Sequence, residues 1–173
     1  MTLSQFPLLK VIFFFDNLSL IWLKAFMENE TLRILIVEDD KVTAELNKRL
    51  LGRYGEVIVA NTVGQAHNFL NGFKFDVAFF DLNLAGELDG LRLLKLARHL
   101  NVYSIVVSGE TATEVLEEAF VNGAKDFLNK PFNKEKLGVV WKRFENFRKD
   151  IEFENLINKS FITKSQSLTE ELY

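Results

Sequence analysis

The sequence predicts a doubly wound α/β fold, in which five parallel strands form one sheet flanked by five helices. From residue 32 onward, short apolar runs alternate with stretches of helical period, and this alternation is typical of such folds. Runs such as ILIV, VAFF and SIVV are apolar throughout, as expected for strands that helices cover on both faces. Glycines at the ends of helical stretches mark the turns back into the sheet.

The first half of this pattern runs from residue 32 to residue 81. The run ILIV predicts a strand over 32–38, and Asp40 is expected to cap the helix that follows over 41–52. A second strand is predicted over 57–60. Thr62 with Gln65 is the capping-box pattern that opens a helix over 63–72. The apolar run VAFF predicts the third strand, over 76–81.

The second half repeats the alternation. A helix over 90–99 leads to a fourth strand over 104–108, and a helix over 113–122 ends at Gly123. A short fifth strand is predicted over 126–129. The last helix, over 134–151, shows apolar residues at heptad-like spacing: Leu137, Val140, Phe144, Phe147 and Ile151. Residues 151–173 are expected to form a helical extension, with a flexible tail over 158–173.

Composition excludes several classes of protein. The chain has 173 residues, of which 48% are hydrophobic and 26% charged, so it is globular rather than disordered. A net charge of −3 gives no reason to expect direct nucleic-acid binding. The absence of cysteine excludes disulfides, thiolate metal sites and a cysteine nucleophile, and it suits a cytoplasmic location. No G-x-G-x-x-G follows a strand, which argues against dinucleotide binding.

Residues 1–30 form a hydrophobic extension outside the alternating pattern. Lys10, Asp16 and Lys24 interrupt this extension, so no membrane span is predicted, and the pattern of a secretory signal is absent. Polar residues seven apart leave an interfacial helix open. A second interpretation is that the native chain starts at Met27.

Polar residues stand where the predicted strands end. In open parallel sheets, ligands bind outside the carboxyl ends of the strands. These ends carry three carboxylates, a hydroxyl and an ammonium: Glu38, Asp39, Asp81, Ser108 and Lys130. Clustered carboxylates raise one another's pKa unless a cation keeps them ionised, and Mg²⁺ favours carboxylate oxygens. The sequence therefore predicts a metal site at this edge.

Residues 32–150 resemble the receiver domains of two-component response regulators. The resemblance rests on an acidic pair after the first strand, followed in order by the motifs FFDLN, VVSGE and FLNKPF. It implies a flavodoxin-like sheet with strand order 2-1-3-4-5 and a receiver domain over 31–150. One departure is Ala85, where the family usually has proline, in a loop that is one residue longer than the commonest form.

The resemblance also implies a chemistry. Asp81 would accept a phosphoryl group from a phosphohistidine on a sensor histidine kinase or a histidine phosphotransfer protein. Glu38, Asp39, Asp81 and the backbone carbonyl of Asn83 would hold Mg²⁺. The domain would be a signalling protein rather than an enzyme, and its output would be an unknown partner protein.

Further residues take roles from the same resemblance. Lys130 would neutralise the phosphoryl oxygens, and Ser108 would hydrogen-bond the phosphate. Phe127 occupies the aromatic switch position, and Lys130–Pro131 is expected to be a cis peptide. A homodimer through the fourth and fifth helices stays open.

Two other functions compete with phosphoryl acceptance. A hydrolase or transferase with an aspartate nucleophile would need an Asp two residues after Asp81, where Asn83 stands. The other is a receiver-like interaction module that works without phosphorylation, and this alternative stays open.

Overall fold

The computed structural model describes residues 31–82, 84, 89–109 and 113–170. The predicted extension over 1–30 lies outside the described residues, as does the choice of Met27 as the native start.

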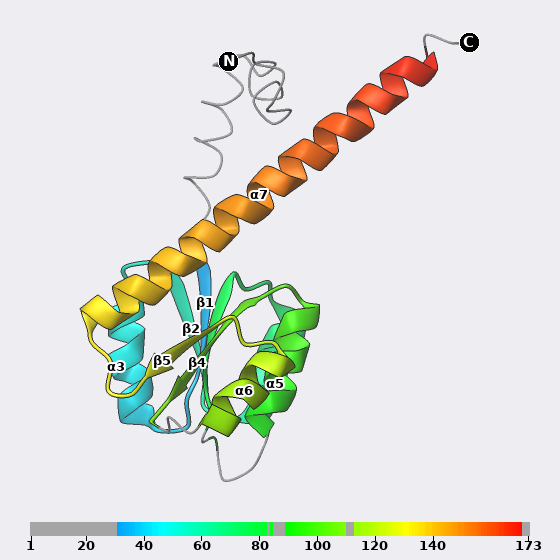
Figure 1. Ribbon diagram of the computed structural model, residues 1–173. Helices are drawn as coiled ribbons and strands as arrows, with labels where there is room; N and C mark the ends of the chain where they lie inside the picture. The colour runs from blue at the N-terminus through cyan, green and yellow to red at the C-terminus, as the bar shows by residue number, and fades with distance from the viewer. Residues whose placement is uncertain (1–30, 83, 85–88, 110–112, 171–173) are drawn as a thin grey trace. The chain divides into compact units, whose positions relative to one another are not determined.

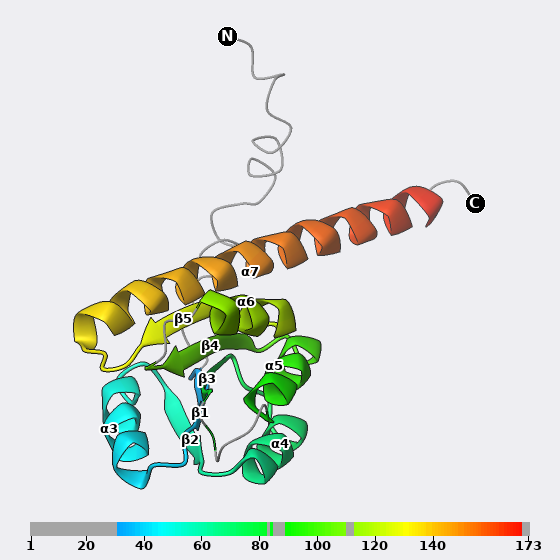
Figure 2. The ribbon, with the colours of Figure 1, turned by 60° about the horizontal axis from the view of Figure 1, so that its bottom comes forward.

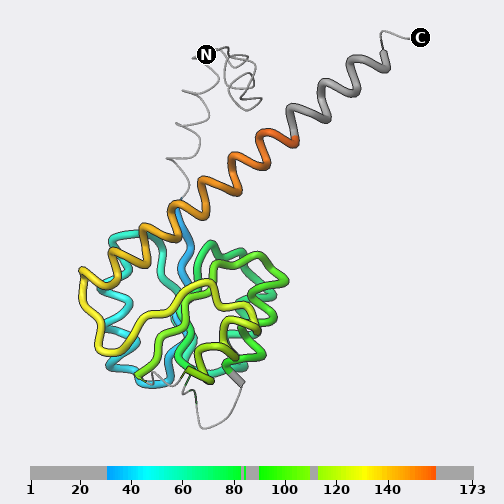
Figure 3. Tube along the Cα trace, viewed as in Figure 1, coloured from blue at the N-terminus to red at the C-terminus, as the bar shows by residue number. Residues whose placement is uncertain are grey.

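The described chain forms one five-stranded parallel sheet with strand order β2-β1-β3-β4-β5 (Figure 1). The strands are β1 (Arg33–Val37), β2 (Glu56–Ala60), β3 (Val77–Asp81), β4 (Tyr103–Ser108) and β5 (Asp126–Asn129). The trace in Figure 3 shows the blue β1 segment lying inside the sheet, between strands that come later in the sequence. The predicted fold class and strand order are therefore confirmed.

Helices cover both faces of this sheet, as the rotated view in Figure 2 shows. The described helices are α3 (Lys41–Leu51), α4 (Val63–Gly72), α5 (Asp89–His99), α6 (Thr113–Asn122) and α7 (Lys134–Glu170). Helices α3 and α7 lie on one face, and α4, α5 and α6 lie on the other. Apart from the end of α7, the predicted bounds differ from these by at most one residue, which is the usual fraying of element ends.

The core explains why the strands are apolar on both sides. The four residues Ile34–Val37 are each at most 1% exposed, because alternate side chains point into the two helical layers. Leu35 packs in a cluster with residues of α4, α5 and α6, including Leu70 and Leu94. The two-sided burial removes the alternating pattern that a half-exposed strand would show.

Two predicted helix caps are present, one of them with a change. The Asp40 side chain accepts a hydrogen bond from the Thr43 backbone N–H at 2.7 Å, so it caps α3. The Thr62 hydroxyl accepts from the Gln65 N–H at 3.1 Å. The reciprocal bond of a capping box would reach the Thr62 N–H, but Gln65 Oε1 instead accepts from the Asn61 N–H at 2.9 Å. The bond accepted by the Gln65 side chain is thus made by Asn61, one residue closer to β2 than the N-cap Thr62.

Helix α7 corrects the prediction for the end of the chain. The expectation was a helix over 134–151, a helical extension beyond it and a flexible tail over 158–173. Helix α7 includes the extension, but it also continues through the expected tail as far as Glu170. No glycine or proline follows Gly138, so nothing in the sequence interrupts the helical backbone. The first turns dock on the sheet through Leu137, Trp141 and Phe144, each at most 4% exposed.

Aromatic contacts extend this docking. Trp141 stacks on Tyr54 with ring centroids 4.1 Å apart, and Phe144 lies 5.3 Å from Tyr103 on β4.

In the part of the chain that is described, no helix is both long and apolar enough to cross a membrane.

Candidate functional site

The predicted site residues meet at one edge of the sheet, the edge toward which the strand arrows point in Figure 1. Glu38 directly follows β1, and Asp81 is the last residue of β3. Ser108 ends β4, and Lys130 directly follows β5. Because all five strands are parallel, their carboxyl ends lie on the same side. Residues that are distant in the sequence are thus brought together.

Three carboxylates form a compact cluster at this edge. One ligand oxygen each from Glu38, Asp39 and Asp81 lie within 4.8 Å of one another. Glu38 is 3% exposed and Asp81 is 6% exposed, whereas Asp39 is exposed. Three hard oxygen donors, one of them open to solvent, fit a divalent cation such as Mg²⁺, which keeps several of its waters.

Lys130 lies between the two buried carboxylates. Its Nζ donates to Glu38 Oε2 at 2.6 Å and to Asp81 Oδ2 at 2.7 Å. Burial raises the pKa of Glu38, and the hydrogen bond from Lys130 opposes this only in part. Burial by itself would lower the pKa of Lys130, but the hydrogen bonds to Asp81 and Glu38 outweigh it and raise that pKa. The ammonium therefore stays charged and balances the cluster.

The loop that carries Glu38 and Asp39 is held at both ends. Asp40 caps α3 at one end. At the other end, the side-chain amide of Asn61 donates to the backbone carbonyl of Glu38 at 2.9 Å. Sequence reasoning did not single out Asn61. The available signal was its position directly after β2, the strand that lies beside β1.

Ser108 and Lys130 are joined through the backbone. Ser108 is fully buried and pairs with Asn129 in the register of β4 and β5, and its carbonyl accepts from the Lys130 N–H at 2.9 Å. The Lys130–Pro131 peptide bond is cis. Phe127 on β5 is partly buried and packs against the core. Asn83 and Ala85 lie outside the described residues.

A groove lies beside Lys130. Its volume is about 630 Å³, and it is formed by one side of α3 and by the segment that follows β5. The lining is mainly apolar and includes Leu46, Leu50, Pro131 and Phe132.

Known proteins share this sequence pattern. Residues 34–141 match the family model described as the response regulator receiver domain. The transcriptional regulatory protein KdpE of Staphylococcus aureus is 33% identical over 127 residues, which cover 72% of this chain and 54% of KdpE. The cell cycle transcriptional regulator CtrA of Caulobacter vibrioides is 29% identical over 109 residues, which cover 61% of this chain and 47% of CtrA. The chain spans about half the length of these curated relatives.

Solved structures share the fold. A CheY-like response regulator receiver domain protein from Methanospirillum hungatei superposes with a TM-score of 0.64 at 28% identity, covering 70% of this chain and 99% of that one. The BeF3-activated receiver domain of DrrB, a response regulator of Thermotoga maritima, gives a TM-score of 0.60 at 27% identity. That match covers 68% of this chain and 99% of the DrrB receiver.

Proposed function

Since the chain belongs to the family of response regulator receiver domains of two-component signalling systems, we propose that it accepts a phosphoryl group on Asp81. The donor would be a phosphohistidine on a sensor histidine kinase or on a histidine phosphotransfer protein. One observation carries the proposal: the Asp81 carboxylate lies at the strand edge within 4.8 Å of two other carboxylates and 2.7 Å from an ammonium. As a receiver domain, the chain serves signalling and is not a conventional enzyme.

In the proposed transfer, an oxygen of the Asp81 carboxylate forms a bond to phosphorus while the P–N bond of the donor phosphohistidine breaks. The electron pair of that bond returns to the imidazole, and Asp81 becomes an acyl phosphate. Lys130 already contacts Asp81, so its ammonium is positioned to pair with the phosphoryl oxygens. The chain thus contributes a nucleophile and a fixed positive charge.

Glu38, Asp39 and Asp81 would hold Mg²⁺, with the backbone carbonyl of Asn83 as a further ligand. Bound Mg²⁺ would neutralise negative charge on the phosphoryl group and on the carboxylates. The negative charges of Glu38 and Asp81 would then be balanced by the cation together with Lys130, whose ammonium contacts both carboxylates. Asp39, the exposed member of the cluster, offers the ligand that solvent reaches most easily.

Ser108 and Phe127 would convert the phosphoryl group into a signal. Ser108 would donate its hydroxyl to the phosphate, and Phe127 would turn inward as the end of β4 moves. The buried Ser108 and the partly buried Phe127 support this proposal, because both lie on strands that pair at the site. The changed surface would be that of α6, β5 and α7, where an output protein or a second copy of the chain would bind.

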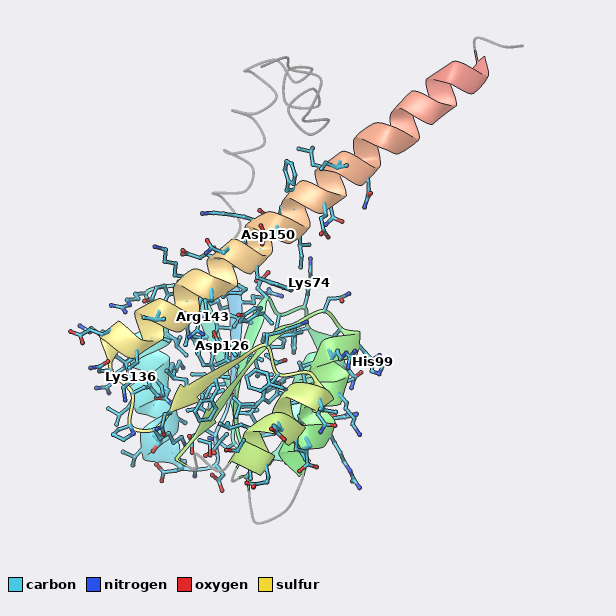
Figure 4. The ribbon with its side chains drawn as sticks, in the orientation of Figure 1. Lys74, His99, Asp126, Lys136, Arg143 and Asp150 are labelled. Carbon is cyan, nitrogen blue, oxygen red and sulfur yellow. The ribbon has the colours of Figure 1, made fainter. Side chains whose placement is uncertain are left out.

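The test is phosphoryl uptake measured by intact mass. Incubation with a small acyl-phosphate donor and Mg²⁺ should add one phosphoryl group per chain, and chelation of divalent cations should prevent it. Asp81→Asn should take up none, whereas Asp150→Asn, a change on the solvent side of α7 (Figure 4), should behave as wild type. An Asp81→Asn protein that gains the same mass with the same Mg²⁺ requirement would disprove the assignment. A wild type that gains no mass would favour the phosphorylation-independent interaction module.

A further inference from the structure

We propose that Asn61 is a positioning residue for the metal site, which holds the Glu38–Asp39 peptide group in the orientation that Mg²⁺ binding needs. This inference rests on the proposed function, because it assigns a role in the same acidic cluster. Asn61 is not in the set of residues that would contact the cation. It acts through the backbone of Glu38.

The geometry begins with the pairing of β1 and β2. The two strands pair from Arg33 with Glu56 to Val37 with Ala60. One step further, the Glu38 N–H still donates to the Ala60 carbonyl at 3.1 Å. The Glu38 carbonyl is the next acceptor, but β2 has ended and the chain turns into α4. The side-chain amide of Asn61 donates to this carbonyl at 2.9 Å and so replaces the missing backbone bond.

Asn61 is itself held in place by the start of α4. Its N–H donates to Gln65 Oε1 at 2.9 Å, while the Gln65 N–H donates to the Thr62 hydroxyl at 3.1 Å. These bonds fix the backbone of Asn61 relative to the helix. The shift of the capping bond from Thr62 to Asn61 therefore connects the first turn of α4 to the loop that carries the acidic pair.

The consequence for the metal site follows from the planar peptide group. The carbonyl of Glu38 and the nitrogen of Asp39 belong to one rigid plane, so holding the carbonyl also fixes the Cα of Asp39. Lys130 contacts the Glu38 side chain, but it does not hold this peptide plane. Asn61 thus orients two successive carboxylates before a cation arrives. Residues that orient metal ligands in this way commonly affect affinity for the metal.

The experiment measures Mg²⁺ binding directly. Isothermal titration calorimetry on the full chain should show that Asn61→Ala raises the Mg²⁺ dissociation constant about 3- to 10-fold, the range that corresponds to the loss of one ordinary hydrogen bond. Gln65→Ala should raise it less, because Asn61 keeps its own amide. At saturating Mg²⁺, phosphoryl uptake by Asn61→Ala should match that of wild type, since no group that contacts the phosphoryl changes.

The matched control is Asn122→Ala. The Asn122 amide also donates to a backbone carbonyl, that of Glu118 at 2.7 Å, but within α6. The melting temperature of each variant shows whether a change in Mg²⁺ affinity is accompanied by a loss of stability. An Asn122→Ala protein with the wild-type dissociation constant, beside a weakened Asn61→Ala protein, supports the inference.

Three results would count against these proposals in different ways. An Asn61→Ala protein that binds Mg²⁺ as wild type does, whether or not it melts earlier, would overturn the role of Asn61. A wild type that binds Mg²⁺ but takes up no phosphoryl group would overturn the proposed function, and the dissociation constants would still decide the role of Asn61. A wild type that binds no Mg²⁺ would overturn both.

Discussion

The ammonium of Lys130 lies 2.6 Å from Glu38 Oε2, although 92 positions separate the two residues along the chain. The same nitrogen lies 2.7 Å from Asp81 Oδ2. Both carboxylates are buried, so each would be costly to ionise without a nearby positive charge. Lys130 supplies that charge from the position directly after β5, and it therefore links the stability of the fold to the chemistry of the site.

Removal of this ammonium should destabilise the protein. We predict that Lys130→Ala lowers the free energy of unfolding by about 1–3 kcal/mol without divalent cations, because Glu38 and Asp81 lose their shared partner. Addition of Mg²⁺ should recover part of this loss. Urea unfolding with and without Mg²⁺ measures both effects. Lys142→Ala, at an exposed position of α7, is the control. A Lys130→Ala protein as stable as wild type without Mg²⁺ would contradict the prediction.

A second ion pair joins β5 to α7. Arg143 Nε lies 3.0 Å from Asp126 Oδ2, and Figure 4 shows the two side by side. The Asp126 side chain is 6% exposed and that of Arg143 is 56% exposed. We predict that Arg143→Ala lowers the free energy of unfolding at neutral pH by about 1 kcal/mol, since solvent already screens the arginine. A double-mutant cycle with Asp126→Asn should show that most of this loss disappears when the carboxylate is absent.

The same pair predicts a pH dependence. Burial raises the pKa of Asp126, so the folded protein keeps this proton to a higher pH than the unfolded chain does. The contribution of Asp126 to stability is therefore fully present below its unfolded pKa of about 3.9, and it is lost as the pH rises through the raised folded value. Arg143 favours the charged form, so its removal should matter most at neutral pH and little near pH 4. A loss that is equal at both pH values would show that Arg143 acts through packing instead.

The sequence was sufficient for the fold because its signals are local. The run ILIV predicts a fully buried strand, and the described residues Ile34–Val37 are fully buried. Asp40 and Thr62 predict helix starts, and both side chains accept the expected backbone bond. Because the strands are parallel, Glu38, Asp81 and Lys130 must lie at one edge of the sheet. This much could be predicted from the sequence without knowing any distance between them.

Other features depend on contacts that no local pattern encodes. The bond from Asn61 to Glu38 exists because β2 ends beside β1 at that point, and neither residue indicates the other in the sequence. The contact between Lys130 and Glu38 depends on side-chain geometry across four neighbouring strands, from β1 to β5. A helical extension beyond residue 151 was predicted, but the segment from residue 158 was expected to be flexible, whereas the backbone continues as a helix to Glu170.

Asp40 should affect stability without affecting the metal. It follows Glu38 and Asp39, but its side chain accepts from Thr43 and caps α3. These hydrogen bonds lower the pKa of Asp40, so its contribution is present above the unfolded pKa and is lost as the pH falls through the lowered value. We predict that Asp40→Ala lowers the melting temperature at neutral pH and leaves the Mg²⁺ dissociation constant close to that of wild type. A large loss of Mg²⁺ affinity would place Asp40 in the metal site.

Gly123 should be far less tolerant of a side chain than other glycines of the domain. Its φ of +119° lies in a region that residues with a Cβ rarely adopt. A Cβ there would lie 2.9 Å from the Cβ of Arg98 and 3.1 Å from the Leu94 carbonyl oxygen, so α5 and α6 would have to separate. We predict that Gly123→Ala lowers the free energy of unfolding by about 2–4 kcal/mol, because backbone strain and overpacking act together.

Gly64 provides the opposite case in the same molecule. It lies in α4, and a Cβ at this position would meet nothing within 4 Å. Gly64→Ala should therefore stabilise the protein by about 0.5–1 kcal/mol, since alanine is the better helix former. Urea unfolding of wild type and of both variants at one pH measures the two changes in the free energy of unfolding, which should have opposite signs. A Gly123→Ala protein as stable as Gly64→Ala would contradict the close approach of residue 123 to Arg98 on α5.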